Sequence, residues 1–396
     1  MNKIVNVLCV SDFFLPGFLA GGPIRTIDNM RKLLAGRVNL SVFTRDRDLG
    51  SDATYSGIKT NQWIESSGGS IYYASPDAFG PRGLRQVLAS RDFDIVYLNS
   101  FFSPRASIYP CLALRWGAHK QRVLLAPRGE FSPGALAVKH FKKRAFLALA
   151  RLLGLYRDVY WHASTQMEEA DILRLFPSAN GRIYVASDPV IASPLDAISS
   201  PLPKKVGRLR IAFISRISPM KNLDGLIRIL MTIRAPIDLD IFGPIEDETY
   251  WNQCQKEIAK LPDNIHVSSH GPISPEMVSS TFARHDLFAF PTHGENFGHV
   301  IYEALRVGTP VLISDQTPWL PDASGAVTAI PLDDVDSWRT AIQVAAAATV
   351  EQYNMRRMAA FEYAKQYIAS SATADENLRM FQLVASEDTG PAFLNN

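Results

Sequence analysis

The 396-residue sequence predicts an α/β protein made of two doubly wound, Rossmann-like domains, and three observations lead to that prediction. Short apolar runs alternate with helix-length segments through most of the chain. A Pro- and Ser-rich stretch without periodicity, residues 188–207, interrupts this pattern, which then starts again. Strict alternation is typical of a parallel sheet with helices on both faces. Two such runs joined by a linker predict two domains that face each other across a cleft.

The apolar runs that we interpret as strands fall into two groups. In the first half they are IVNVLCVS (4–11), VNLSVFT (38–44), SIYYAS (70–75), FDIVYLN (93–99), RVLLAP (122–127), VYWHAS (159–164) and RIYVAS (182–187). Helical stretches between them include residues 23–35, 104–119, 134–155 and 166–175. In the second half the strands are LRIAFIS (209–215), IDLDIFG (237–243), NIHVSS (264–269), DLFAFP (286–291), PVLISD (310–315) and AVTAIP (326–331), and the chain beyond about residue 334 reads as helical.

These patterns set the expected domain boundaries. We expect a first domain over 1–190, a linker over 191–207, a second domain over 208–370, and a C-terminal helix and tail over 371–396 that cross back to the first domain. Ligands of doubly wound sheets bind beyond the carboxyl ends of the strands. Functional residues are therefore expected directly after strands.

Composition excludes several classes of protein. The formal net charge is +2, which argues against a nucleic-acid groove. Cys9, Cys111 and Cys254 are odd in number, far apart and in no metal-binding spacing, which favours a reducing, cytoplasmic compartment. The opening apolar run is too short for a signal peptide and reads as a buried strand. No apolar run reaches the ~18 residues of a membrane span.

The first candidate site lies in RLRIAFISRISPMKNLDGLI. Arg216 follows a strand, Lys221 comes five residues later, and Asn222 stands where it can cap the next helix. Two cations at a strand exit beside a helix start suit a phosphate or diphosphate. The alternative is a pair of solvated loop charges.

The second candidate site lies in FPTHGENFGHVIYEALRVGTPVLISD. Glu295 lies in the turn before a helix and Glu303 lies inside that helix. The amides of Asn296, Phe297 and Gly298 are expected to be donors there, and a glycine allows close approach to the backbone. Carboxylates and amides together suit a polyol joined to a phosphate. The alternatives are compensation of the helix dipole for Glu295 and an ordinary exposed position for Glu303.

Two further segments follow strands of the first half. Gly21 and Gly22 precede a helix that has a proline at its first position, which resembles half of a phosphate-binding loop. Arg128 and Glu130 leave another strand at its carboxyl end. The basic helix that follows, residues 139–157, could contact an anionic membrane surface or a phosphorylated acceptor, and the alternative is a solvated helix face.

The sequence gives no indication of a metal site. Three D-x-D pairs occur, and we interpret all three as structural: Asp46 with Asp48, Asp92 with Asp94, and Asp238 with Asp240. The histidines show no ligand spacing.

Taken together, these motifs resemble the retaining GT-B glycosyltransferases of the family called group 1, or GT4. Glu295, NFGHVIY and Glu303 form that family's E-x7-E motif. SRISPMKNLDGLI resembles its diphosphate segment, and IFGPIED with HGPIS resembles its nucleoside-binding loops. The GG pair after the first strand and APRGEFSPGAL resemble the family more loosely. In pattern, the resemblance covers about residues 3–370.

The resemblance implies a role for each matching residue. Arg216 and Lys221 would neutralise the departing diphosphate. Glu295 and the 296–298 amides would hold the donor sugar, and Glu303 would hold the ribose. Gly22, next to Gly21, would let the backbone approach the phosphate. The base pocket would be lined by Gly243, Pro244 and Ile273.

The implied activity is metal-independent transfer of a hexose from a UDP- or GDP-sugar to a saccharide or lipid-linked saccharide, in surface polysaccharide synthesis and without a cofactor. The sequence departs from the family at Arg128, near which many members have a histidine, and at ASDPV, where the domain crossover usually reads NG. Two alternatives stay open: a nucleotide-sugar epimerase on the same fold, and a non-catalytic nucleotide-sugar-binding protein.

Overall fold

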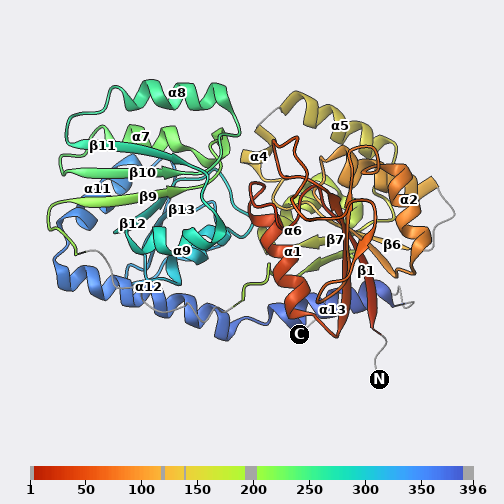
Figure 1. Ribbon diagram of the computed structural model, residues 1–396. Helices are drawn as coiled ribbons and strands as arrows, with labels where there is room; N and C mark the ends of the chain where they lie inside the picture. Colours follow the sequence, from red (N-terminus) through yellow and green to blue (C-terminus); the bar gives the residue numbers. More distant parts are fainter. Residues whose placement is uncertain (1–3, 117–120, 138–139, 192–202, 387–396) are drawn as a thin grey trace. The chain divides into compact units, whose positions relative to one another are not determined.

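The computed structural model divides into two compact units (Figure 1). Unit 1 comprises Met1–Ile191 and Ala372–Asn396, and unit 2 comprises Ala192–Ser371. The structure describes residues 4–116, 121–137, 140–191 and 203–386. Most of the predicted linker and the end of the predicted tail therefore lie outside the described residues.

Unit 1 is built on an eight-stranded sheet with the order β3-β4-β2-β1-β5-β6-β7-β8. Its strands are β1 (Val5–Val10), β2 (Val38–Arg45), β3 (Trp63–Ile64), β4 (Ile71–Ala74), β5 (Ile95–Asn99), β6 (Arg122–Ala126), β7 (Tyr160–Ala163) and β8 (Ile183–Val185). All neighbouring pairs are parallel except β3 with β4. The central strands are buried on both faces, which explains their continuous apolar sequences.

Helices cover this sheet. They are α1 (Gly22–Leu33), α2 (Pro81–Ser90), the π-helix η1 (Pro104–Ile108), α3 (Tyr109–Trp116), α4 (Pro133–Ala137), α5 (His140–Leu152), α6 (Gln166–Leu175), the short 3₁₀ turn η2 (Pro177–Ala179) and α13 (Thr373–Ala385). Met380, Phe381 and Val384 of α13 share a core cluster with residues of β1 and β5. The predicted return of the C-terminal helix to the first domain is thus confirmed.

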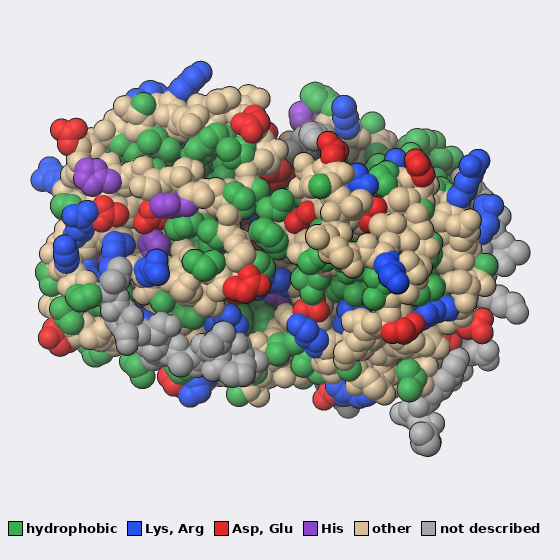
Figure 2. All heavy atoms as spheres, in the orientation of Figure 1, with side chains coloured by type: hydrophobic (Ala, Val, Ile, Leu, Met, Phe, Trp, Pro, Cys, Tyr) green, Lys and Arg blue, Asp and Glu red, His purple; other side chains and the backbone are tan. Residues whose placement is uncertain are grey.

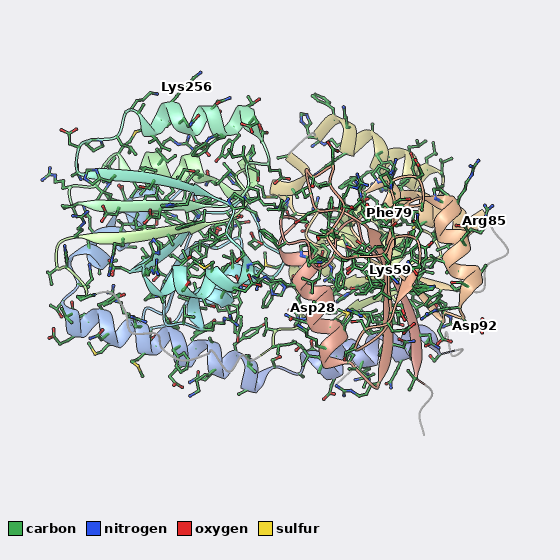
Figure 3. The ribbon with its side chains drawn as sticks, in the orientation of Figure 1. Asp28, Lys59, Phe79, Arg85, Asp92 and Lys256 are labelled. Atoms are coloured by element: carbon green, nitrogen blue, oxygen red, sulfur yellow. The ribbon has the colours of Figure 1, made fainter. Side chains whose placement is uncertain are left out.

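The other core cluster of unit 1 is rich in aromatic side chains. The Phe101 ring lies 4.6 Å, centre to centre, from both Phe131 and Tyr156, and Trp161 lies 5.1 Å from Phe176. Figure 3 shows Phe79 among the crowded side chains of this unit.

Unit 2 is built on a six-stranded, all-parallel sheet with the order β11-β10-β9-β12-β13-β14. Its strands are β9 (Leu209–Ile214), β10 (Ile237–Phe242), β11 (Ile265–Gly271), β12 (Leu287–Phe290), β13 (Val311–Ser314) and β14 (Val327–Ile330). Its helices are the 3₁₀ turn η3 (Pro219–Lys221), α7 (Leu223–Leu230), α8 (Glu248–Ile258), α9 (Pro275–Ala283), α10 (His299–Leu305), α11 (Val335–Ala347) and α12 (Val350–Ser370). Helices α7 and α8 lie on the opposite side of the sheet from α9 and α12 (Figure 1).

Two of the predicted helices differ from those in the structure. The predicted helix 104–119 is a π-helix followed by α3, and its last residues, 117–120, lie outside the described part of the chain. The predicted helix 134–155 is two helices, α4 and α5. Helix α5 ends before Gly154, which adopts a φ of 57° that ends a helix readily.

Within the described residues, no helix is both long and apolar enough to cross a membrane.

Candidate active site

The strand order of unit 2 reverses between β9 and β12, and three predicted donor residues lie beside this point. Arg216 and Lys221 follow β9, and Glu295 follows β12. Ligands of doubly wound sheets bind beyond the carboxyl ends of the strands at such a reversal. The fold therefore brings both sequence motifs to the position where a ligand is expected.

Lys221 and Glu295 form an ion pair, Nζ to Oε1, across 74 residues of sequence. Their side chains are 11% and 15% exposed, so water screens the pair only partly. Lys221 Nζ also lies 5.5 Å from the centre of the Phe290 ring. One cation and one carboxylate are thus held side by side in a half-enclosed position.

Asn222 fixes the segment that carries Lys221. It occupies the N-cap position of α7, as predicted, but its side chain makes no capping hydrogen bond to that helix. Its backbone is left-handed, with a φ of 56°, a conformation that asparagine tolerates better than most residues. Its Nδ2 instead donates to the carbonyl oxygen of Pro291 at 2.8 Å. Asn222 therefore ties the exit of β9 to the exit of β12.

Sequence reasoning missed a second link between these strand exits, centred on Met220. Its carbonyl oxygen accepts from the Thr292 hydroxyl at 3.1 Å and from the His293 amide at 2.8 Å. The Glu295 amide donates to the Gln316 carbonyl oxygen at 3.0 Å. The loop that carries Glu295 is thus held from two sides. In the sequence, the only local indication of this link is Thr292, a polar residue that follows a buried strand.

Arg216 lies on the side of the site next to β10. Its Nη1 is 3.0 Å from Oε1 of Glu246, and both side chains are more than a third exposed. Ile217, the next residue, donates its amide to the Pro244 carbonyl oxygen at 2.9 Å. A Cβ atom on Gly243 would lie 1.8 Å from the Ser215 carbonyl oxygen, so only glycine fits there. Arg216, Gly243 and Pro244 therefore belong to one pair of touching loops.

The loop after β11 lies next to the loop after β10. The Gly243 amide donates to the Gly271 carbonyl oxygen at 2.8 Å, and half-buried Ile273 follows two residues later. The three residues predicted to line a base pocket are thus contributed by neighbouring strand exits.

The segment before α10 is held by its backbone. The Phe297 carbonyl oxygen accepts from Trp319 Nε1 at 2.6 Å. Gly298 has a φ of 80° and directly precedes α10. Glu303, inside α10, is only 7% exposed, which rules out the alternative of an ordinary exposed helix residue. Asn296, also predicted as a donor residue, lies in the same segment as Glu295.

In unit 1, Gly21 and Gly22 lead from the β1 exit into α1. Gly21 has a φ of 76°, which favours glycine, and its amide donates to the Phe18 carbonyl oxygen at 3.0 Å. Pro23 occupies the first turn of α1, as the sequence predicts.

Arg128 is held inside unit 1. Its side chain is 6% exposed, and its Nη1 lies 2.5 Å from Asp188 Oδ1. Its Nη2 donates to the Tyr97 hydroxyl at 2.6 Å and to Asn99 Oδ1 at 2.9 Å. Burial alone would lower the pKa of Arg128, but the charge of Asp188, together with smaller contributions from neighbouring groups such as Glu168, outweighs burial and raises it. These contacts favour a structural role over contact with an acceptor.

Glu130 is held in a similar way. Its carboxylate accepts from the amides of Phe101 and Phe102, at 2.7 and 2.9 Å, and from the Ser100 hydroxyl at 2.8 Å. Burial raises its pKa against the effect of these bonds. Both residues predicted on the acceptor side therefore have internal partners.

At least one aspartate of each D-x-D pair has a protein partner. Asp46 pairs with Arg47 at 2.8 Å, Asp94 accepts from the Asn6 amide at 2.9 Å, and Asp238 pairs with Arg208 at 2.6 Å. Among the described residues, no group of three or more His, Cys, Asp or Glu side chains could hold a metal ion.

A cavity of about 550 Å³ adjoins the strand exits of unit 2. It is lined by Pro219, Asn222, Asp224, Gly225, Arg228, Ile229, Tyr250, Gln253, Pro291, His293, Leu332, Val335 and Trp338. None of the predicted donor residues lines it, because it opens on the side of α7, α8 and α11.

Comparison with known proteins finds a family model that matches part of unit 2. Residues 196–326 match the family model described as glycosyl transferases group 1. Unit 2 thus contains a stretch similar to the group 1 glycosyl transferases, which we call the group 1 domain. The β9, β10, β11 and β12 exits described above all lie within this group 1 domain.

Curated relatives and solved structures also resemble this chain. A D-inositol 3-phosphate glycosyltransferase of Xylanimonas cellulosilytica is 27% identical over 196 residues, which cover 44% of this chain and 43% of that protein. The chain therefore matches less than half the length of this relative. Two solved structures cover 96% of the chain: Anabaena HepE with UDP and glucose (TM-score 0.66, 16% identity, 99% of that chain) and trehalose-6-phosphate synthase OtsA (TM-score 0.70, 13% identity, 98% of that chain). The fold is that of the GT-B glycosyltransferases.

Proposed function

We propose that this chain is a retaining GT4-type hexosyltransferase. It moves a hexose from a UDP- or GDP-sugar to a saccharide or lipid-linked saccharide. The group 1 domain supports sugar transfer, and the HepE complex with UDP and glucose supports a nucleotide-hexose donor. The relative named as a D-inositol 3-phosphate glycosyltransferase supports a polyol acceptor.

The contact between Lys221 and Glu295 is the observation that carries this proposal. In a nucleotide sugar, the hexose and the distal phosphate share one oxygen atom. A cation that holds the phosphate and a carboxylate that holds the hexose hydroxyls must therefore be neighbours. The ion pair between Lys221 and Glu295, at the reversal of strand order where ligands of this kind of sheet bind, supports these two roles.

The proposed chemistry follows from charge. The bond between the anomeric carbon and the phosphate oxygen breaks, and the electron pair leaves with the phosphate. Lys221 and Arg216 stabilise the added negative charge. The acceptor oxygen then bonds to the same face of the sugar, and its proton moves to the departing phosphate oxygen. No metal-bound step enters this scheme.

The remaining donor contacts extend away from the ion pair. Glu303, a buried carboxylate, holds the ribose hydroxyls. Gly243, Pro244 and Ile273, on adjacent strand exits, line the base pocket. Asn296, Phe297 and Gly298 face the hexose with their amides. We place the reaction in surface polysaccharide synthesis, where lipid-linked saccharides are common acceptors.

A thermal-shift screen of UDP- and GDP-sugars tests the proposal. A true donor at one hundred times its dissociation constant stabilises the folded chain by about 2.7 kcal/mol. The Glu303→Gln variant is expected to lose most of that shift, and Glu257→Gln, on the surface of α8, is expected to keep it. If no nucleotide sugar stabilises the wild type, or Glu303→Gln responds fully, the donor assignment is wrong.

Product analysis separates sugar transfer from epimerisation. A transferase releases nucleoside diphosphate in an amount that rises with added saccharide acceptor. An epimerase interconverts the nucleotide sugar whether or not an acceptor is present.

A further inference from the structure

Helix α5 exposes large apolar side chains that no other described element of unit 1 covers. Phe141, Leu149, Leu152 and the following Leu153 are 78%, 53%, 84% and 57% exposed. Such side chains are common singly on protein surfaces, but four within thirteen residues form a patch. Figure 2 shows hydrophobic and basic side chains side by side at the surface over α5.

The apolar residues fall on one line of the helix. At 3.6 residues per turn, Phe141, Ala145, Ala148 and Leu152 follow one another along the outward face, and Leu149 lies beside them. Leu147 and Ala150, on the opposite face, are buried in the core of unit 1. Helix α5 is therefore apolar on its outer as well as its inner face.

Cations flank the outer apolar line. Arg144 and Arg151 lie on one side of it and Lys142 lies on the other, and all three are exposed. None of the thirteen residues of α5 is Asp or Glu. This pattern of an apolar centre between two rows of cations is typical of helices that lie flat in a lipid interface.

We infer that α5 docks unit 1 onto the surface of an anionic lipid bilayer. Phe141, Leu149, Leu152 and Leu153 enter the boundary between headgroups and acyl chains, and the three cations contact lipid phosphates. The inference goes beyond the proposed sugar transfer and does not depend on it. It extends the membrane contact predicted for the basic helix 139–157. The exposed apolar side chains can be buried in the bilayer, and this adds a hydrophobic contribution that charge alone cannot supply.

The composition of α5 favours a lipid surface over a protein partner. Lysine is depleted in protein interfaces, whereas lipid headgroups accept Lys and Arg beside inserted apolar side chains. Three cations without a neighbouring acid in the helix complement a surface of negative charge. A second copy of the chain would bring the same cations toward one another, which costs free energy.

Vesicle flotation of the full chain tests the inference. We expect binding to phosphatidylcholine vesicles that contain ~30% phosphatidylglycerol, weak binding to phosphatidylcholine alone, and release by high salt. Phe141→Ser with Leu152→Ser should weaken binding by roughly tenfold or more per side chain. Lys142→Gln, Arg144→Gln and Arg151→Gln together should weaken it by roughly 100-fold, at about fivefold per cation.

Matched controls use exposed residues elsewhere. Lys59→Gln, Arg82→Gln and Arg85→Gln remove three exposed cations of the same unit, and Figure 3 labels Lys59 and Arg85 away from α5. Met355→Ser with Met358→Ser removes two exposed apolar side chains of α12. These controls should float like the wild type. The thermal unfolding midpoint, measured without ligand, reports the folding of every variant and is not expected to fall.

Three outcomes would overturn the inference. One is equal flotation of the α5 variants and their controls. Another is absence of binding to anionic vesicles while light scattering shows a dimer that the Phe141 and Leu152 substitutions dissociate. The third is a wild type that does not bind vesicles and stays monomeric, which would mean that another part of the chain covers α5.

Discussion

Gly243 shows how a single residue shapes the candidate site. A Cβ atom there would lie 1.8 Å from the Ser215 carbonyl oxygen, and its φ of 140° is one that side chains rarely adopt. At Gly271, also left-handed with a φ of 69°, a Cβ atom would meet nothing within 4 Å. Comparing an alanine substitution at Gly243 with one at Gly271 therefore separates the free-energy cost of steric collision from that of backbone strain.

We therefore expect Gly271→Ala to lower the free energy of unfolding by about 1–2 kcal/mol. Gly243→Ala should cost a further ~1–3 kcal/mol because the backbone must move, and it should also weaken nucleotide binding. Urea unfolding and nucleotide titration measure both quantities. Equal costs for the two variants would show that the contact with Ser215 does not constrain the loop.

His162 predicts a dependence of stability on pH. Its Nε2 lies 2.7 Å from the Ala186 carbonyl oxygen, which can only accept, so Nε2 carries the proton and Nδ1 accepts from the Tyr97 hydroxyl at 2.5 Å. Burial, and secondarily the charge of Arg128, lowers the pKa of His162 from 6.5 to about 4. Between these two values the unfolded chain binds a proton that the folded chain does not. The free energy of unfolding therefore falls as the pH falls from 6.5 toward 4.

The expected loss through His162 is on the order of 3 kcal/mol over this interval. The measurement compares urea midpoints at about pH 7 and about pH 5. The His162→Gln variant should show a smaller drop than the wild type, whereas His266→Gln, exposed on β11, should show the full drop. If both variants keep the full drop, His162 is not its source.

Arg128 shows the limit of reading single residues. A cation directly after a strand looks like a site residue, and its position was predicted correctly. Its partner Asp188 lies 60 residues further along the chain, where no local pattern indicates the contact. Lys221 and Glu295 were also both singled out, but their ion pair depends on β9 and β12 being neighbours, which the order of elements in the sequence does not reveal.

At the scale of elements, the loops between β9 and α7 and between β12 and α10 act as one structure. Asn222 joins them through its bond to Pro291 and through its left-handed backbone. Asn222→Gly can still adopt the left-handed backbone conformation but loses the hydrogen bond to Pro291. It should lower the free energy of unfolding by about 1–2 kcal/mol. Asn222→Ala also introduces a strained φ and should cost about 2–3 kcal/mol. A wild-type urea midpoint for Asn222→Ala would contradict this role.

Elements with long apolar runs were predicted well, and short or composite ones were not. The central strands of both sheets were recognised because burial on both faces leaves continuous apolar sequence. The two-residue strand β3 pairs Trp63 with Tyr72 in the antiparallel sense and is too short to show periodicity. The break between α4 and α5 was missed because both segments have helix-forming composition. The exposed apolar line of α5 was missed because a sequence does not say which apolar residues find a partner.

At the scale of the whole molecule, the alternation of strands and helices was sufficient to predict two doubly wound units. The return of α13 to unit 1 follows physically from Phe381, which is fully buried against Tyr97 at 5.5 Å between ring centres. The group 1 match in unit 2 and the GT-B fold of the chain then limit the chemistry to be tested. What the pattern could not supply is the identity of the sugar and the acceptor, because these depend on side-chain contacts that differ among proteins of one fold.

The most direct test of the central claim is calorimetric titration of UDP and of a UDP-hexose into the wild type, Lys221→Met and Glu295→Gln, with GDP and a GDP-hexose if the screen selects them. If Lys221 holds the phosphate and Glu295 the hexose, Lys221→Met weakens both ligands by about 10- to 100-fold. Glu295→Gln weakens only the nucleotide sugar, and it leaves UDP unchanged or tighter because Lys221 loses its competing partner. Equal weakening of both ligands by Glu295→Gln, or unchanged binding in Lys221→Met, would contradict the account.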